Sequence, residues 1–266
     1  MGKSSDMKST AAVEEALARI DEIDSSGYEL NSVLALDVSA LARAAEFDKE
    51  STSLPLQGAP ILIKDNIEAI GLPATAGSFA LNNTPIVKDS PIAERLRRAG
   101  AVIVGSTNLS EWANIRSTKS TSGWSALGGL TANPWKHRHS AGGSSSGSGA
   151  AVAAGLTQWA IGSETDGSII CPSSLNGCVG IKPTVGSIPR DGMIPISSSQ
   201  DSPGPMTQTV AQAALLLDVL SDRNEYFGVT QSENAIKVGV VREWMSADAQ
   251  VSALFEDSLS KLEKTG

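Results

Sequence analysis

Residues 142 to 149 form an unbroken run of eight glycines and serines. They pass without a break into the small apolar segment AAVAAG, residues 150 to 155. Side chains this small let a helix pack closely against its neighbours, so we expect the serines to lie in a loop that leads to the N-terminus of a buried helix. The alternative is a flexible linker, but linkers do not usually continue directly into a compact apolar helix.

A phosphate-binding loop is a second alternative for this run, because a helix N-terminus exposes free backbone N–H groups. The run lacks the G-K-[ST] ending of a P-loop. It also lacks the G-x-G-x-x-G pattern between a strand and a helix. Phosphate binding is therefore the weaker interpretation.

Apolar periodicity elsewhere predicts an α/β fold. Residues 93–108 indicate a helix that ends near Gly100 and is followed at once by a strand at 101–104, and a short buried strand is predicted at 60–63. Amphipathic helices are predicted at 12–23, around 39–49 and at 251–266. Further short strands are expected within 177–184 and 236–244.

Charge and hydropathy exclude several classes of partner. The chain has 21 Lys and Arg against 29 Asp and Glu, a formal net charge of −8, which disfavours binding to a phosphate backbone. Apolar stretches are shorter than the roughly 20 residues that cross a bilayer, and residues 1–20 lack the apolar core of a signal peptide. We expect a cytoplasmic protein with neither a nucleic-acid nor a membrane partner.

The segment GSETDGSI, residues 162–169, predicts a serine nucleophile. Ser168 follows a turn in which Gly162 and Gly167 flank two acidic residues, so its hydroxyl can be exposed beside converging N–H groups. The usual histidine base is poorly supplied, because His137 and His139 both lie in a polar stretch. A base other than histidine is required.

Lys64 is the best candidate for that base. It directly follows the apolar residues 61–63, and a lysine at the end of a buried strand can be desolvated. Desolvation lowers the pKa of the amine and makes its neutral form a usable base. A lysine whose stem packs on the surface and whose ammonium reaches water is the alternative.

Five segments, taken in order, resemble the amidase signature family: IKDNI, GSTNLSEWA, AGGSSSGSGAAVAAG, GSETDGSI and GCVGIKPTVGSI. The similarity runs from about Leu30 to beyond Met206 and is greatest to the branch with the bacterial peptide amidases, which release ammonia from C-terminal peptide amides. It implies an α/β fold with a mixed sheet covered by helices. Family members usually continue well beyond residue 266, so we expect residues 1–266 to form the N-terminal part of a single domain that lacks its C-terminal half.

The resemblance also implies a Ser–Ser–Lys triad. Lys64 falls on the lysine of the family's K-D-N motif, Ser144 on the bridging serine and Ser168 on the nucleophile. In such enzymes an unusual cis peptide precedes the bridging serine. The remaining implied roles belong to the backbone N–H groups of the oxyanion hole, at Thr165, Asp166 and Gly167, and to supporting hydrogen bonds from Ser145 and Ser146. Neither a metal nor an organic cofactor is implied.

The implied activity is the hydrolysis, through an acyl-enzyme, of a C-terminal peptide amide or a small uncharged amide. Many family members have G-T-D-T-G-G-S-I-R where this chain has Glu164, Asp166 and Ile170. Loss of the arginine puts an amidotransferase A-type subunit, which binds glutamine, in doubt without removing it. The remaining alternative is a truncated, inactive or scaffold-like fragment, which would form a homodimer or bind a complementary chain.

Overall fold

The computed structural model describes residues 8–49, 53–232 and 237–264 of the chain. The chain divides into two compact units, Met1–Thr230 and Gln231–Gly266. The second contains a short 3-10 helix, Arg242–Trp244, and α8, Ala249–Lys264. That residues 1–266 form a single domain stays a prediction.

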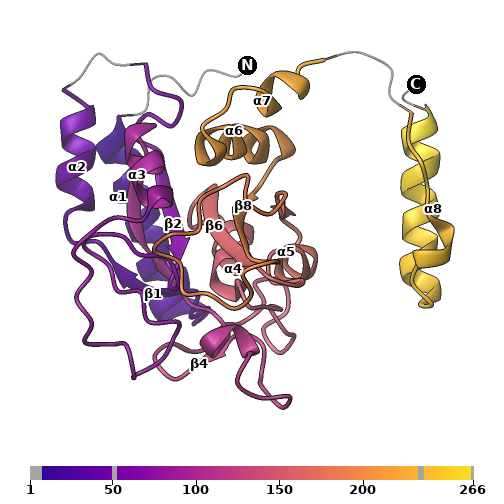
Figure 1. Ribbon diagram of the computed structural model, residues 1–266, viewed down its shortest axis with the longest axis horizontal. Coiled ribbons are helices and arrows are strands. Elements are labelled where there is room, and N and C mark those ends of the chain that lie inside the picture. Colours follow the sequence, from indigo (N-terminus) through magenta and orange to yellow (C-terminus); the bar gives the residue numbers. More distant parts are fainter. Residues whose placement is uncertain (1–7, 50–52, 233–236, 265–266) are drawn as a thin grey trace. The chain divides into compact units, whose positions relative to one another are not determined.

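The first unit is built on a six-stranded mixed sheet with the order β1-β3-β2-β6-β8-β7 (Figure 1). β2 runs parallel to β3 and to β6, and the other neighbouring strands pair antiparallel. The expected mixed sheet is therefore confirmed. In chain order the strands are β1 Val33–Leu36, β2 Pro60–Lys64, β3 Val102–Thr107, β6 Trp159–Glu164, β7 Val179–Gly180 and β8 Ser202–Thr207, and a separate two-stranded sheet joins β4 Trp124–Ser125 to β5 Gly129–Leu130.

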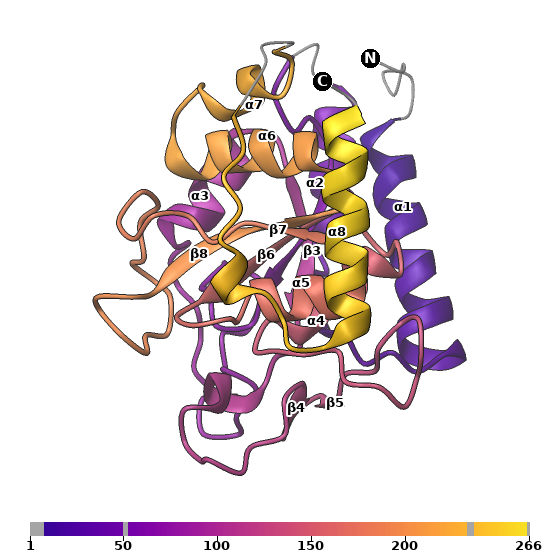
Figure 2. The same cartoon turned by 90° about the vertical axis from the view of Figure 1, so that its right-hand side faces the viewer.

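Helices cover both faces of the six-stranded sheet. In Figure 2 the strands lie between α3 and α6 on one side and α4 and α5 on the other. The helices of this unit are α1 Ser9–Arg19, which continues as a π-helix at Ile20–Gly27, then α2 Ala40–Phe47, α3 Pro91–Arg98, a 3-10 helix at Glu111–Asn114, α4 Ser146–Ala153, α5 Ile170–Asn176, α6 Val210–Ser221 and α7 Tyr226–Val229.

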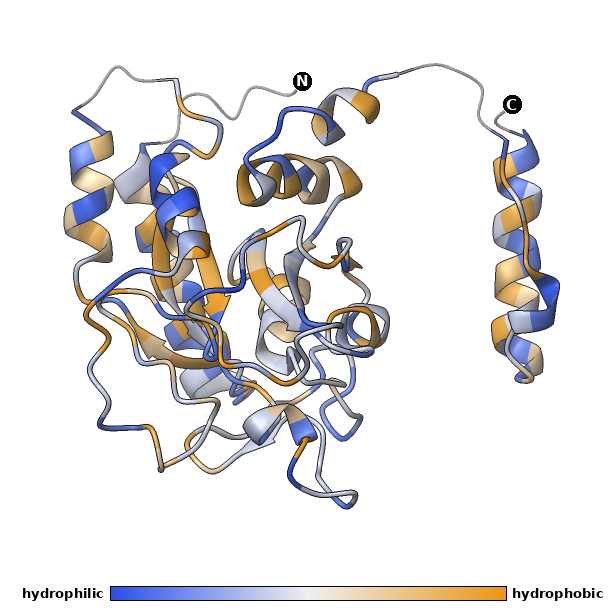
Figure 3. Cartoon of the chain, in the orientation of Figure 1, coloured by the Kyte–Doolittle hydropathy of each residue, from blue (hydrophilic) through white to orange (hydrophobic). Residues whose placement is uncertain are grey.

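The two faces of the sheet separate the core into two apolar layers because successive side chains of a strand point to opposite faces. On β2, Ile61 and Ile63 pack in the cluster that contains α3 and α6, whereas Leu62 packs in the cluster with α1, α2 and α4. β3 alternates in the same way, with Ile103 in the first cluster and Val102 in the second. Figure 3 shows the apolar residues concentrated along the central strands and α6.

Local signals set both ends of α3, and the predicted end near Gly100 is confirmed. The Ser90 side chain accepts a hydrogen bond from the amide of Ala93, and Pro91 occupies the first turn. Gly100 follows the helix with φ +89°, a conformation that suits glycine. The strand that comes next is longer than the predicted 101–104, because pairing with β2 continues as far as Thr107.

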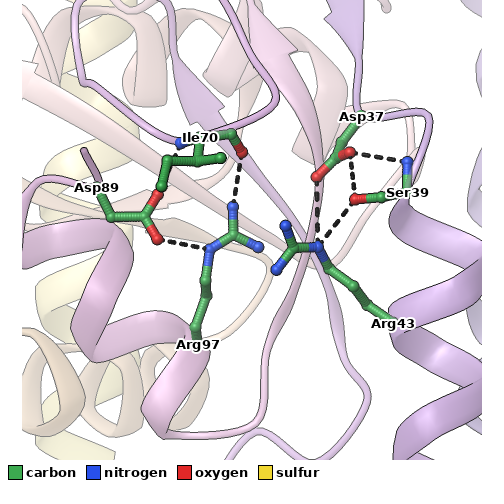
Figure 4. A network of polar contacts seen from close by, with 6 residues as sticks. All are labelled: Asp37, Ser39, Arg43, Ile70, Asp89 and Arg97. Atoms are coloured by element: carbon green, nitrogen blue, oxygen red, sulfur yellow. Dashed lines mark hydrogen bonds and ion pairs between the residues drawn. The ribbon is translucent and has the colours of Figure 1, made fainter. Parts of the chain in front are cut away.

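A polar network fixes the loop that follows β2 (Figure 4). Nε of Arg97 on α3 lies 3.0 Å from Oδ2 of Asp89, and its Nη2 donates to the carbonyl of Ile70 at 3.0 Å. The amide of Ile70 donates to Oδ1 of Asp89 at 2.7 Å. On the other side of the same picture, Asp37 and Arg43 join the end of β1 to α2. The loop that begins directly after Lys64 is therefore tied to α3.

The strand predicted at 236–244 is wrong over its described part. Residues 237–241 have no strand structure, and residues 242–244 form a 3-10 helix; residue 236 lies outside the described residues. Val238 and Val241 are 54% and 53% exposed. An apolar run becomes a strand only when another strand supplies its backbone hydrogen bonds, and the described residues provide none for this segment. In the described part of the chain, no helix has the length and apolar character needed to span a membrane.

The glycine and serine run forms a loop that enters α4, and the linker interpretation is wrong. Residues 146–152 are all buried. A Cβ on Gly147 would lie 2.2 Å from the carbonyl oxygen of Ser32 and 2.6 Å from that of Asn108. The Gly147 amide donates to the same Asn108 oxygen at 2.9 Å. α4 can approach this backbone only because its residue here has no side chain.

We expect Gly147→Ala to lower the free energy of unfolding by about 1–3 kcal/mol, because two fixed backbone oxygens must move. Chemical denaturation, followed by the shift in midpoint, measures this change. Gly228→Ala in α7 is the matched control, since its Cβ would meet nothing within 4 Å. Equal stability of the two variants would contradict the close-packing argument.

Candidate active site

Lys64 ends β2 with its side chain completely buried. Its Nζ donates to Oγ of Ser144 at 2.7 Å, to Oγ of Ser163 at 3.0 Å and to the carbonyl of Ser163 at 3.1 Å. Burial lowers the pKa of this amine from 10.5 to about 7, because the charged form loses its hydration. The carboxylates of Glu164 and Asp201 partly oppose that shift by favouring the charged form. The alternative in which the ammonium of Lys64 reaches water is therefore wrong.

Ser144 lies in the loop before α4, and the peptide bond between Gly143 and Ser144 is cis, as the resemblance implied. Its carbonyl accepts a hydrogen bond from the amide of Ser110 at 3.1 Å. A Cβ on Gly143 would lie 2.3 Å from Oγ of Ser110. Lack of a side chain at Gly143 thus lets the loop after β3 press against the backbone that carries Ser144.

Two serines that follow Ser144 hold the loop in place. Oγ of Ser145 donates to the carbonyl of Ser163 at 3.1 Å and accepts from the amide of the same residue at 3.2 Å. Oγ of Ser146 donates to the carbonyl of Gly142 at 2.6 Å. The first contact fastens the loop to β6, and the second closes the first turn of α4.

Ser168 lies in the turn between β6 and α5, and Glu164 organises that turn. Oε1 of Glu164 accepts from the amide of Gly167 at 2.8 Å, and Oε2 accepts from the amides of Ile169 and Ile170 at 2.7 and 2.9 Å. The carboxylate is buried, with 6% of the residue exposed. Hydrogen bonds from backbone N–H groups to a carboxylate are charge-assisted and therefore strong. Glu164 is thus a clamp on the residues that flank Ser168.

The amides expected to form an oxyanion hole are not equivalent in this conformation. The amide of Gly167 is occupied by Glu164. In contrast, the amides of Thr165 and Asp166 donate to no side chain within the described residues. The carbonyl of Thr165 accepts from Nζ of Lys182 at 2.7 Å, which fixes this peptide from its other end.

The structure brings Lys64 and Ser144 into direct contact and brings Ser168 beside them. The carbonyl of Ser168 accepts from the amide of Ser145 at 3.1 Å, so the two serine-bearing segments are joined through their backbones. In the described part of the chain, no hydrogen bond links the hydroxyls of Ser144 and Ser168. The three residues of the expected triad thus lie close together. Of the two side-chain hydrogen bonds that the triad needs, one is formed.

Sequence reasoning missed three residues that complete this region. Ser163 receives hydrogen bonds from Lys64 and also from Nδ2 of Asn66, at 3.0 Å. Asp201 accepts from the hydroxyl of Thr165 at 2.5 Å and, through its other oxygen, from the amides of residues 196 and 197. Ser163 and Asn66 lie within two of the segments that resemble the amidase signature family, so their place in the sequence could have indicated a role in the site. Nothing near Asp201 in the sequence indicates its contact.

The chain is similar to known proteins in sequence and in fold. A family model described as Amidase matches residues 11–266. The chain is similar to the crystal structure of the native peptide amidase from Stenotrophomonas maltophilia, with a TM-score of 0.80 and 48% identity, covering 89% of this chain and 49% of that one.

Two curated relatives extend the comparison. Mandelamide hydrolase of Pseudomonas putida is 38% identical over 269 residues, covering 96% of this chain and 50% of the relative. The A-type subunit of the glutamyl-tRNA(Gln) amidotransferase of Methanosarcina mazei is 37% identical over 270 residues, covering 96% of this chain and 56% of the relative. The chain therefore spans about half the length of these proteins.

The buried amine of Lys64 makes stability depend on pH in a defined window. Its pKa falls from an ordinary value of 10.5 to about 7 in the folded chain, so the unfolded chain binds more protons between these two values. The free energy of unfolding should therefore rise with pH across that window. We expect wild type to gain on the order of 2 kcal/mol between pH 6 and 9 relative to Lys64→Met, measured by denaturation at both pH values. A difference between the two proteins that is independent of pH would contradict the burial argument.

Glu164→Gln should loosen the Ser168 turn, because an NH2 group replaces one acceptor oxygen and faces backbone donors. We expect the free energy of unfolding to fall by about 1–3 kcal/mol. Asp166→Asn is the matched control, since it removes a carboxylate from the same turn that is exposed and accepts no hydrogen bond within the described residues. If both variants unfold at the same denaturant concentration, the clamp is not a stabilising feature.

Proposed function

The chain belongs to the amidase family, and from that premise we propose that it hydrolyses a carboxamide through a Ser–Ser–Lys triad and releases ammonia. One observation carries the proposal: Nζ of Lys64 is fully buried, lies 2.7 Å from Oγ of Ser144 and has a pKa of about 7. A base is most effective when its pKa lies near the working pH. An ordinary lysine is protonated at that pH and cannot accept a proton.

The first half-reaction forms an acyl-enzyme. Ser168 Oγ bonds to the carbonyl carbon of the substrate while its proton passes to Ser144 and the proton of Ser144 passes to Lys64. The carbonyl electron pair moves onto oxygen. When the C–N bond breaks, the relayed proton returns to the leaving nitrogen, and ammonia departs. This relay requires a hydrogen bond between the hydroxyls of Ser144 and Ser168. Catalytic hydrogen bonds often form only when substrate is bound.

Backbone amides of the Ser168 turn stabilise the oxyanion in this proposal. Thr165 and Asp166 offer amides that no side chain occupies in the described residues, whereas Gly167 would have to exchange its bond to Glu164 for one to the substrate. Water then attacks the acyl-enzyme, gives one proton to the relay and frees Ser168. The carboxylic acid leaves, and the triad returns to its initial state.

The substrate we propose is a C-terminal peptide amide or another amide that is uncharged at the reacting group. Ile170, two residues after Ser168, is 47% exposed and brings an apolar side chain to this turn. Similarity to a peptide amidase supports the same substrate class.

A role as an amidotransferase A-type subunit is the second candidate, favoured by 37% identity to such a subunit over 96% of this chain. It predicts that glutamine hydrolysis appears only with partner subunits. Ammonia release from glutamine, with and without a partner preparation, distinguishes it from a stand-alone hydrolase.

Ser168→Ala should lower kcat for a peptide amide by on the order of 10^4-fold, because the nucleophile is lost. Ser144→Ala should also abolish most turnover, since the proton relay is broken. Ammonia release measures both. Ser199→Ala, a substitution at an exposed serine, is the control and should retain wild-type kcat.

A fluorophosphonate probe tests the nucleophile directly. We expect mass spectrometry to find the label on the peptide that contains Ser168. Turnover that persists in Ser168→Ala would refute the assignment. A folded wild-type chain that neither reacts with the probe nor releases ammonia would instead support an inactive fragment.

A further inference from the structure

A hollow of about 460 Å³ lies between residues 111 and 124, the loop that follows β3. Two tryptophans, Trp112 and Trp124, and two cations, Arg116 and Lys119, are among the residues that line it. Trp124 is 45% exposed. The hollow thus offers apolar ring surface beside positive charge.

The loop that carries this hollow is tied to the backbone of Ser144. Ser110, at the start of the same loop, donates its amide to the carbonyl of Ser144 at 3.1 Å. Its hydroxyl accepts from the amide of Gly123 at 2.9 Å, near the other end of the loop. One serine therefore ties both ends of the loop beside the segment that carries Ser144.

The backbone of the loop is unusual where the hollow begins. Trp112, Ala113 and Asn114 are three consecutive residues with φ of 50°, 53° and 67°. Residues other than glycine rarely adopt this conformation, and such outliers gather at functional sites. The indole N–H of Trp112 is covered and has no acceptor among the described residues.

The charges of the hollow are unbalanced. Neither Arg116 nor Lys119 forms an ion pair within the described part of the chain. Glu111 also lines the hollow, where its Oε2 accepts from the amide of Ala126 at 2.9 Å, so one negative charge stands against the two positive charges. Two unpaired cations in a protein of net charge −8 form a local site of opposite sign. Such a site attracts anions and guides their approach.

We propose that this hollow binds an acidic side chain of the substrate. The preferred substrate is then an amide whose acyl part carries a carboxylate away from the carboxamide. Arg116 and Lys119 bind the carboxylate, and the tryptophan rings cover the apolar part of the chain. This inference rests on the proposed function, which accounts for hydrolysis of the carboxamide. It adds a preference for a negative charge elsewhere in the substrate.

Two isosteric probes test the charge, acetyl-Asp-Phe-amide and acetyl-Asn-Phe-amide. We expect wild type to favour the Asp probe about 5- to 10-fold in kcat/KM, mainly through KM, with the preference shrinking as salt is added. In Arg116→Gln/Lys119→Gln the preference should fall to about 1. Lys136→Gln/Arg138→Gln, which removes the same charge from an exposed loop outside the hollow, should keep it.

A binding measurement separates this inference from the proposed function. Calorimetry with the Ser168→Ala chain gives the dissociation constant of each probe without turnover. If wild type releases no ammonia but the Asp probe still binds more tightly, and the hollow variant loses that difference, the site stands and the hydrolase assignment fails. Equal binding of both probes, binding of neither, or a preference that survives in the hollow variant overturns the site.

Discussion

The buried amine of Lys64 needs hydrogen-bond partners and nearby charges that the rest of the structure must supply. Lys64 ends the central strand β2 with no exposed surface, so its amine must be neutral there, or its charged form must be well bound. Its partners come from two other segments, Ser144 from the loop before α4 and Ser163 from the neighbouring strand β6. The carboxylates of Glu164 and Asp201 keep its pKa from falling further. A base with a pKa of about 7 results from this balance.

Close approach of α4 to the sheet makes that arrangement possible. Gly147 allows the helix to lie against the backbone of residues 32 and 108, and Gly143 allows Ser110 to lie against the loop. Serines of the same run supply the hydrogen bonds that burial demands, including Ser145 to β6 and Ser148 to the carbonyl of Ile161 at 3.0 Å. Small size and hydrogen-bonding capacity are thus both needed in one segment. A run that looks like a linker by composition is a tightly packed part of the molecule.

Most of the fold around the site was predictable because its signals are local. Short apolar runs and the Gly100 signal indicated β2, α3 and β3, although pairing extended β3 to Thr107. The prediction of a strand at 236–244 was wrong because a strand also needs a partner, which is not a local property. This apolar run has no partner strand among the described residues, and its valines are half exposed. Glu164 was visible as a departure from the family pattern. Its three hydrogen bonds to the Ser168 turn were not.

The chemical types in this region can be read from the amino-acid sequence: a lysine at the end of an apolar strand, serines in glycine-rich loops, and no suitably placed histidine. Which of them meet depends on the tertiary structure. The contact of Lys64 with Ser144 joins residues 80 positions apart, and that of Asp201 with Thr165 joins residues 36 apart. Such contacts depend on how strands are ordered in the sheet and how closely helices pack on it. The pKa of Lys64 depends on the same packing, because desolvation is a property of the surroundings and not of the residue.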